Sequence, residues 1–512
     1  MLAGGRLRGY PRRELCSLLL VFSVAFAARL AVWRLIPVDW NSDSYHHWQI
    51  SYLSLKVGFP RWRMWDLNGC ELYWGMVPHL VQAVLLFALS TASIVPYRVL
   101  NLLLGSVNPC IVYLIGRDNF NREVGAYAGL LFALYPVAAV FDVIAMQETL
   151  ALSLALLSIC LFATRPGWSG FLLALACQSR IEYWLASIVF VIGVTLAERF
   201  STRIQSFLFS WIGVTWVFCT LFWVWTSNPF YPIYWSLYNV FGGWADNGPG
   251  LPFHRLMFDY IGEKFTAWSM KATGLALLGS FAASLGAFLH TIRRRGGRSH
   301  VYLFFFTVLA VFSPLFVTYY PRFPSSLLLM LRESIPIAAL GSVLLCYIVF
   351  RAKDRLFRGS LLTLPLEAIL IAVALLPYGY LIPAYQQFQV DSLEAFTVAD
   401  RAFGYYNGGT IVCDHPTMNY RLCTKWRVRA SDLLGNHYSP HYYGVTDPLE
   451  YANWFERNDV TIWIHEGKRA DAVWEVASSE MPGLLVLREE VHDAKIYEVD
   501  RAILDGFIRA EG

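Results

Sequence analysis

The chain has 512 residues, of which 56% are hydrophobic and only 15% are charged. Soluble domains have about 45–50% apolar and about 25% charged residues, so this composition excludes an ordinary water-soluble globule. Charge is also uneven, because residues 391–512 hold 20 of the 37 acidic residues but only 12 of the 41 basic ones. We therefore expect a cationic membrane-embedded body followed by an acidic, water-facing domain.

The N-terminal segment is predicted to be a first membrane span that is retained in the mature protein. Arg6, Arg8, Arg12 and Arg13 precede the apolar run Ser17–Ala31, and no clear small-residue cleavage site follows it. A signal peptide would need such a site, so we do not interpret this segment as one.

Further spans follow from the basic clusters, because short loops rich in Lys and Arg stay cytoplasmic. Each span needs about 20 apolar residues. Placing every basic cluster inside predicts 11 spans, at about 16–36, 97–116, 124–141, 149–164, 169–180, 183–198, 205–226, 267–291, 301–319, 333–350 and 360–381. The N-terminus is then cytoplasmic and the C-terminus extracytoplasmic. The apolar stretch 74–95 is left over, and we predict a juxtamembrane or re-entrant helix there, with Pro78, His79 and Gln82 in a partly wet position.

The predicted fold is thus a polytopic α-helical membrane domain over 1–383 and a soluble α/β domain over 384–512. Two long extracytoplasmic loops, 37–73 and 227–266, belong to the first domain. The C-terminal domain shows strand-like patterns between helical ones. The predicted strands are 410–414, 460–465, 484–487 and 495–499, and the predicted helices include 448–457 and 470–478.

Candidate chemistry begins directly after the first span, in Asn41-Ser-Asp43-Ser-Tyr-His46-His47-Trp. A helix capped by Ser42 or Asp43 would place Asp43, His46 and His47 on one face, at i, i+3 and i+4. A carboxylate beside imidazoles is suited to general base chemistry or to a divalent metal. The alternative is that Asp43 only caps the helix and the histidines lie at the membrane interface.

The same loop resembles a known family. Asp43-Ser-Tyr-His-His-Trp, Gly58-Phe-Pro-Arg-Trp, Asn68-Gly and Trp74-Gly-Met-Val-Pro resemble the first luminal loop of the GT-C glycosyltransferases. These are polytopic enzymes that use polyprenyl-phosphate-linked sugars, and the pattern is similar to oligosaccharyltransferase catalytic subunits and protein mannosyltransferase-like enzymes. The resemblance implies that Asp43 is the essential acid. Trp74 belongs either to a wall that stacks sugars or to an interfacial aromatic belt.

A second match is Gly125-Ala-Tyr-Ala-Gly-Leu-Leu-Phe-Ala-Leu-Tyr-Pro136, which leads into Met146-Gln-Glu148-Thr-Leu. It is similar to the second-loop acidic motif of the family. Met146 and Gln147 stand where the two-acid form of that motif has one of its acids, so Glu148 is the acid that the resemblance retains.

Three arginines are candidates for binding the phosphate of the donor. Ala176-Cys-Gln-Ser-Arg180-Ile-Glu resembles a recurrent turn of the family, and Leu331-Arg332-Glu-Ser-Ile-Pro336 resembles its late span, whose leading Arg faces the donor. Arg322 is a competing candidate. A guanidinium binds phosphate through two parallel hydrogen bonds. The alternative for Arg332 is that it pairs with Glu333 or extends to lipid headgroups.

The resemblance implies a glycosyltransferase that moves a sugar from a polyprenyl- or dolichyl-phosphate donor to a protein, lipid or glycan. Asp43 is expected to be the base, and Glu148 a supporting acid. Arg332, Arg180, Arg322, His46, His47 and Trp74 are expected to bind substrate. A divalent cation, Mg²⁺ or Mn²⁺, is the expected cofactor, on Asp43 and Glu148. The tail lacks the Trp-Trp-Asp-Tyr-Gly block of oligosaccharyltransferases, so the acceptor stays open.

Two other classes stay open at this stage. A transporter or flippase for lipid-linked saccharides would show an internal repeat, broken helices and charges near the midplane. A non-catalytic membrane scaffold would not depend on Asp43. No nucleic-acid partner is expected.

Overall fold

The computed structural model describes residues 12–67, 74–198, 200–234, 299–319, 331–356, 372, 374–435, 439–440, 445–466 and 472–511. The chain forms two compact units. The first comprises Met1–Pro37, Tyr73–Val77 and Arg98–Ala384, and the second comprises Val38–Leu72, Pro78–Tyr97 and Tyr385–Gly512. The predicted span 267–291, most of 360–381, most of the loop 227–266, and Arg322 lie outside the described residues.

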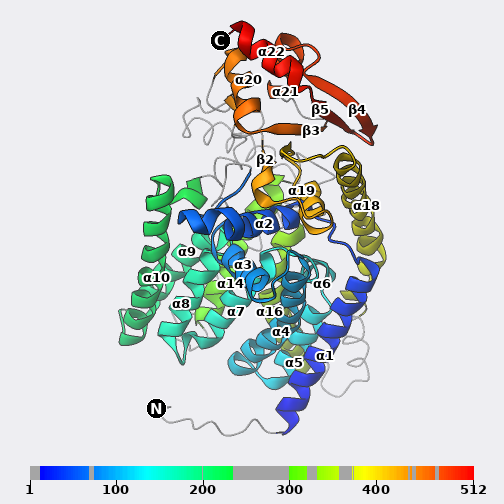
Figure 1. Ribbon diagram of the computed structural model, residues 1–512. Coiled ribbons are helices and arrows are strands. Elements are labelled where there is room, and N and C mark those ends of the chain that lie inside the picture. Colours follow the sequence, from blue (N-terminus) through cyan, green and yellow to red (C-terminus); the bar gives the residue numbers. More distant parts are fainter. Residues whose placement is uncertain are drawn as a thin grey trace. The chain divides into compact units, whose positions relative to one another are not determined.

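The first unit is helical (Figure 1). Its helices are α1 (Arg12–Leu35), α4 (Val95–Asn119, all but its first turn), α5 (Arg122–Ala133), α6 (Pro136–Phe141), α7 (Glu148–Phe162), α8 (Pro166–Cys177), α9 (Glu182–Glu198), α10 (Thr202–Thr226), α14 (Ser299–Tyr319) and α16 (Ser334–Leu356). A 3₁₀ turn, η4 (Leu331–Glu333), precedes α16, and α18 (Tyr378–Phe403) begins in this unit.

Four segments of the described chain are long and apolar enough to cross a membrane. They are α1, α4, α10 and Leu331–Arg351, which joins η4 to most of α16. The protein is therefore an integral membrane protein with a mostly helical fold. The other described helices of the first unit are shorter or less apolar, so the count of about 11 spans stays a prediction.

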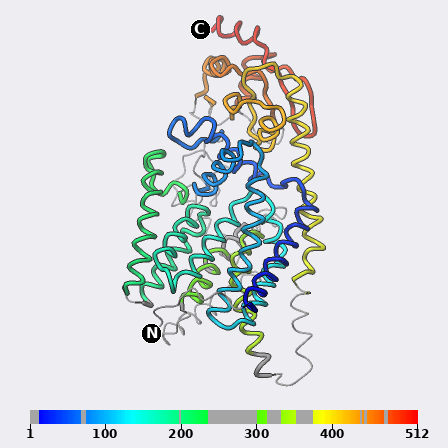
Figure 2. The backbone as a smooth tube through the Cα atoms, turned by 60° about the horizontal axis from the view of Figure 1, so that its bottom comes forward, coloured from blue at the N-terminus to red at the C-terminus, as the bar shows by residue number. Residues whose placement is uncertain are grey.

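Helix packing within the first unit follows from small residues at the contacts. α8 packs against both α7 and α10, and the three helices lie side by side in Figure 2. A side chain at Gly170 of α8 would put its Cβ 2.2 Å from the carbonyl oxygen of Phe207 in α10. Only glycine permits this approach, so the sequence itself sets how closely α8 and α10 pack.

The apolar stretch 74–95 contains a single short helix, α3 (Val77–Ala88). Its 12 residues extend about 18 Å, which is less than the hydrocarbon core of about 30 Å. A helix of this length is too short to cross the hydrocarbon core, as expected of the juxtamembrane or re-entrant helix predicted over 74–95. The predicted partly wet position is wrong, because His79 and Gln82 are 0% and 1% exposed and hydrogen-bonded within the protein.

In the second unit, α2 (Ser42–Leu53) continues as a π turn, η1 (Ser54–Gly58), and a 3₁₀ turn, η2 (Phe59–Arg61). Asn41 caps α2, because its backbone is extended and its Oδ1 accepts the amide hydrogen of Asp43 at 2.9 Å. The predicted cap at Ser42 or Asp43 is therefore wrong by one or two residues. Asp43 lies in the first turn, where the helix dipole favours a carboxylate.

The C-terminal part of the second unit contains a five-stranded mixed sheet of order β2-β1-β3-β5-β4. The strands are β1 (Thr410–Val412), β2 (Leu433–Leu434), β3 (Val460–Glu466), β4 (Leu485–Val491) and β5 (Ala494–Val499). β1 pairs in parallel with β2 and β3, and β5 pairs antiparallel with β3 and β4. His492 and Asp493 form the two-residue turn between β4 and β5, and His492 takes a positive φ of 54°.

The helices of this part are α19 (Pro416–Thr424), the 3₁₀ turn η5 (Ala430–Asp432), α20 (Pro448–Arg457), α21 (Ala472–Glu480) and α22 (Arg501–Glu511). Side chains of α20, α21 and α22 form one apolar core with the sheet, in which Tyr451, Trp463 and Leu504 are almost fully buried. α19 packs instead on α2. The four predicted strands and the predicted helices 448–457 and 470–478 are confirmed to within a few residues at their ends.

Candidate active site

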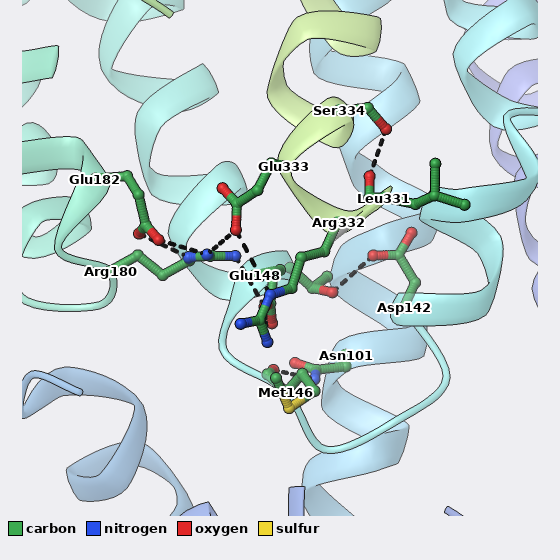
Figure 3. Close-up of polar contacts among 11 residues, drawn as sticks. Asn101, Asp142, Met146, Glu148, Arg180, Glu182, Leu331, Arg332, Glu333 and Ser334 are labelled. Carbon is green, nitrogen blue, oxygen red and sulfur yellow. Dashed lines mark hydrogen bonds and ion pairs between the residues drawn. The ribbon is translucent and has the colours of Figure 1, made fainter. Parts of the chain in front are cut away.

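The segment between α6 and α7 directly precedes Glu148, the second-loop acid, and is buried along its whole length. Side chains of α4 hold its backbone. Arg98 donates from Nε to the carbonyl of Val143 at 2.8 Å, and Asn101 donates to the carbonyl of Ile144 at 2.8 Å. Asn101 also donates to the carbonyl of Met146 at 2.7 Å (Figure 3). A buried irregular segment needs such partners for its carbonyls, so α4 fixes the position at which α7 begins.

Asp142, at the start of this segment, is a structural anchor. Its Oδ2 lies 2.8 Å from Arg29 Nη2, and its Oδ1 accepts from Thr149 Oγ1 at 2.7 Å. Arg29 is fully buried in α1 and also donates to the carbonyl of Ala133 at 2.7 Å. Both Asp142 oxygens are therefore engaged, and a Cβ at Gly105 would lie 2.3 Å from the Asp142 carboxyl carbon.

Glu148 is the first residue of α7, and Arg180 lies in the turn between α8 and α9. Arg180 Nη1 donates to Glu148 Oε1 at 2.8 Å, and its Nη2 donates to Glu333 Oε1 at 2.6 Å. Its Nε and Nη2 also bind the two oxygens of Glu182, at 2.9 and 2.6 Å. Arg180 is thus surrounded by three carboxylates, as Figure 3 shows.

Arg332 completes the cluster from the 3₁₀ turn before α16. Its Nη1 lies 3.5 Å from Glu148 Oε1, and its Nε lies 3.5 Å from Glu333 Oε1. These ion pairs are longer than those of Arg180, and the Arg332 side chain is 11% exposed against 5% for Arg180. The sequence predicted Glu148, Arg180 and Arg332 separately, and the structure brings them together with Glu182 and Glu333.

A small cavity opens at this cluster. Its polar lining is Glu148, Arg180 and Arg332, and its other walls include Tyr183 and Phe312. It has about 10 Å³ of space for the centre of a water molecule, which is room for about one water. Two guanidiniums therefore line a mostly apolar cavity, and guanidinium groups are suited to binding an anionic group such as a phosphate.

Trp74 and Gln147 are tied to the same site. With its nitrogen turned toward them, the Gln147 carboxamide donates to the carbonyls of Trp74 and Ser179, at 3.1 and 2.8 Å. Gly75, with φ of +91°, lets the chain turn against Gln178, whose carbonyl accepts from Val77. Gln147, which directly precedes Glu148, therefore links the backbone of Trp74 to that of Ser179 beside Arg180.

Asp43, His46 and His47 belong to the second unit. His46 Nε2 lies 2.8 Å from Asp66 Oδ2, and Gln49 donates to Asp66 Oδ1 at 2.7 Å. Burial alone would lower the pKa of His46. The charge and the hydrogen bond of Asp66, with a contribution from the charge of Asp43, together outweigh burial, so the pKa of His46 lies above its ordinary value. Asp66 and Asp43 therefore make protonation of His46 easier than for an imidazole in water.

His47 points to a different partner. Its Nδ1 lies 3.0 Å from His79 Nε2, and its side chain is buried. The network around Asp66 also reaches α19, because Asn419 donates to the Gln49 carbonyl oxygen at 2.9 Å. Neither Asp66 nor His79 was predicted as a partner of these histidines, since each is 20 or more residues away in the chain.

The expected divalent cation does not fit the surroundings of Glu148. Glu148 Oε1 faces two guanidiniums within 3.5 Å, and these would repel a cation. Among the described residues, no group of three or more His, Cys, Asp or Glu side chains is arranged to hold a metal ion. The described surroundings of Glu148 therefore do not fit a divalent cation.

No protein-family model and no curated protein matches the chain. Among solved structures it is similar to ArnT from Cupriavidus metallidurans bound to undecaprenyl phosphate, with a TM-score of 0.56, 13% identity, and coverage of 95% of this chain and 98% of that one. The apo state of ArnT gives a TM-score of 0.51 at 12% identity and the same coverage. The oligosaccharyltransferase AglB from Archaeoglobus fulgidus, in complex with an inhibitory peptide and a dolichol-phosphate, gives a TM-score of 0.46 at 12% identity. The match covers 94% of this chain and 74% of AglB.

Proposed function

From the GT-C glycosyltransferase fold that this chain shares with ArnT, we infer that it is a membrane glycosyltransferase. It transfers a sugar from a polyprenyl-phosphate-linked donor to a protein, lipid or glycan acceptor on the non-cytoplasmic side of the membrane. The observation that carries this proposal is the cluster of Arg332, Arg180 and Glu148, which lines a mostly apolar cavity in a fold shared with ArnT, and ArnT was crystallised with undecaprenyl phosphate.

The proposed chemistry is a single displacement. Asp43 takes the proton of the acceptor hydroxyl, and the acceptor oxygen forms a bond to the anomeric carbon. The bond between that carbon and the phosphate oxygen breaks, and its electron pair leaves with the phosphate. Arg332 stabilises the charge that develops there, which is the role of a preorganised cation in such a transition state. Glu148 holds Arg332 and Arg180 in place, while His46 and Trp74 bind substrate.

The test is transfer of a labelled sugar from polyprenyl-phosphate donors by the purified full-length protein. Asp43→Asn keeps the size of the side chain and removes the base, so transfer should fall by at least about 100-fold. The matched control is Asp505→Asn, an exposed position of α22 in the same unit, which should leave transfer unchanged. Full transfer by a folded Asp43→Asn protein would refute the assignment of the base.

The same preparation distinguishes a glycosyltransferase from the two alternatives, a flippase and a non-catalytic scaffold. A flippase would move lipid-linked saccharides across a vesicle membrane without consuming them, and a scaffold would do neither. For the proposed orientation, with the N-terminus cytoplasmic and the C-terminal domain extracytoplasmic, we expect a cysteine placed at Asp118 to react only with reagents that reach the cytoplasmic side. The Asp118 side chain is 52% exposed, so such a cysteine is accessible to the reagent.

A further inference from the structure

The turn that carries Arg332 is closed by a serine. Ser334, the first residue of α16, donates its hydroxyl hydrogen to the carbonyl of Leu331 at 2.5 Å, across the 3₁₀ turn η4 (Figure 3). The Ser334 oxygen also lies 2.6 Å from the hydroxyl oxygen of Tyr135, which is 199 positions away in the chain. A serine hydroxyl has one hydrogen, and a carbonyl can only accept. Tyr135 is therefore the donor in the second bond.

The backbone around Tyr135 is held on both sides. Pro136 follows it, and a residue before proline is restricted to extended conformations, which fits the φ of −67° and ψ of 113° at Tyr135. The carbonyl of Tyr135 accepts from Ala139 in the first turn of α6. Two residues earlier, the carbonyl of Ala133 accepts from the buried Arg29 at 2.7 Å. The Tyr135 hydroxyl is therefore presented from a fixed stretch of backbone.

That stretch leads directly to Glu148. α6 is buried along its whole length and packs against η4, and the segment after α6 is anchored to α4 before α7 begins. The hydrogen bond from Tyr135 thus ties the turn of Arg332 to the same anchored segment that places Glu148. It is an uncharged link, in addition to the ion pair between Glu333 and Arg180.

We propose that Tyr135 is a positioning residue of the donor site. Through Ser334, its hydroxyl holds the turn η4 so that the guanidinium of Arg332 meets the phosphate of the donor. This rests on the proposed function, because it takes a polyprenyl phosphate as the ligand of Arg332. Two parallel hydrogen bonds from a guanidinium to a phosphate require a fixed orientation, so a small shift of the turn weakens them. Tyr135 acts through the turn and does not contact substrate.

The experiment measures binding of two lipids, undecaprenyl phosphate and undecaprenol, to the purified full-length protein in nanodiscs. Undecaprenol has the same apolar chain without the phosphate. Tyr135→Phe keeps the ring and removes only the hydroxyl, so we expect the dissociation constant of undecaprenyl phosphate to rise roughly tenfold, a change of about 1.4 kcal/mol. Binding of undecaprenol should change by less than about twofold, because Arg332 has no phosphate to bind there.

Variants of Ser334 test the route by which Tyr135 acts. Ser334→Ala removes the acceptor of the Tyr135 hydrogen and should weaken binding of undecaprenyl phosphate selectively, whereas Ser334→Thr keeps a hydroxyl and should bind as the wild type does. The double variant Tyr135→Phe with Ser334→Ala should bind no more weakly than Ser334→Ala alone, because the two changes remove one shared interaction. Tyr380→Phe is the matched control, since Tyr380 is 72% exposed in α18 of the same unit and its hydroxyl should not affect either lipid.

Thermal unfolding establishes that each variant is folded before binding is compared. Equal weakening of both lipids by Tyr135→Phe would assign the hydroxyl to the fold alone and overturn the proposal, as would unchanged binding of undecaprenyl phosphate. Full binding by Ser334→Ala would show that Tyr135 does not act through Ser334 and would also overturn it. If the wild type transfers sugar and prefers undecaprenyl phosphate, but Tyr135→Phe has no selective effect, this inference fails and the proposed function stands. If the wild type neither transfers sugar nor prefers the phosphate lipid, both fail.

Discussion

Arg180 Nη2 donates to Glu333 Oε1 at 2.6 Å, although the two residues are 153 positions apart in the chain. This contact joins the turn between α8 and α9 to the turn that begins α16. Because Glu148 binds the same guanidinium, three separate segments of the first unit converge on one side chain. The stability of this unit and the geometry of its site therefore depend on the same charge.

Arg180→Gln is expected to destabilise the protein by about 3–5 kcal/mol, because it leaves buried carboxylates without their counter-ion. Arg165→Gln is the matched control, since Arg165 is exposed at the start of α8 and its loss should change stability by less than about 0.5 kcal/mol. Thermal unfolding of both variants in the same detergent measures the difference. Similar unfolding temperatures for the two variants would contradict the buried role of Arg180.

Much of the fold could be predicted from the sequence, because its signals are local. Hydrophobic runs located most described helices of the first unit, although the predicted span 124–141 is two helices in the structure, α5 and α6. Alternating patterns located four strands, and the chain shares its fold with ArnT. β2 was missed because two residues carry no pattern. The helix cap at Asn41 was missed because Asn, Ser and Asp are adjacent there and all three are good caps.

The candidate site could be predicted only in part, because the contacts between its residues are not local in the sequence. Glu148, Arg180 and Arg332 stand out as charged residues against an apolar background. Their partners could not be assigned from the sequence. An ion pair such as Arg180 with Glu333 is made by tertiary packing, and residues 153 positions apart show no recognisable spacing in the sequence. For the same reason, Gln147 could be seen as a departure from the family pattern, but its contacts to two backbone carbonyls could not.

Gly105→Ala is expected to disrupt the anchored segment before α7. The new Cβ would lie 2.3 Å from the carboxyl carbon of Asp142, and that carboxylate cannot move without losing Arg29 and Thr149. We expect destabilisation of about 1–3 kcal/mol, as for an overpacked core. Gly213→Ala, also in a helix but with open space around it, should be neutral or slightly stabilising. Equal unfolding temperatures for the two alanine variants would contradict this packing.

The pair between His46 and Asp66 should make stability depend on pH. The pKa of His46 is raised in the folded protein, so folding favours the protonated form. Its contribution is then fully present below the unfolded pKa of about 6.5 and is lost as pH rises through the higher folded value. Comparing wild type with His46→Gln, we expect a stability difference of about 1–2 kcal/mol at pH 5.5 that shrinks by pH 9.

The control for this pair is His492→Gln, in the exposed turn between β4 and β5. It should change the unfolding temperature little at either pH. A difference between wild type and His46→Gln that grows with rising pH would mean that folding favours the neutral imidazole, and would contradict the assignment of Asp66 as an ionised partner.

Gln147→Glu tests whether a second acid beside Glu148 creates a metal site. The carboxamide of Gln147 donates to the carbonyls of Trp74 and Ser179, whereas a carboxylate has no hydrogen to donate and would face two carbonyl oxygens beside Glu148. We expect a loss of stability of about 1–3 kcal/mol and reduced sugar transfer, with no stimulation by Mg²⁺ or Mn²⁺. Gln205→Glu is the matched control, because that carboxamide also donates to a backbone carbonyl but is exposed to solvent. A stable Gln147→Glu enzyme whose transfer rises with added Mg²⁺ or Mn²⁺ would show instead that this position accepts a metal ligand.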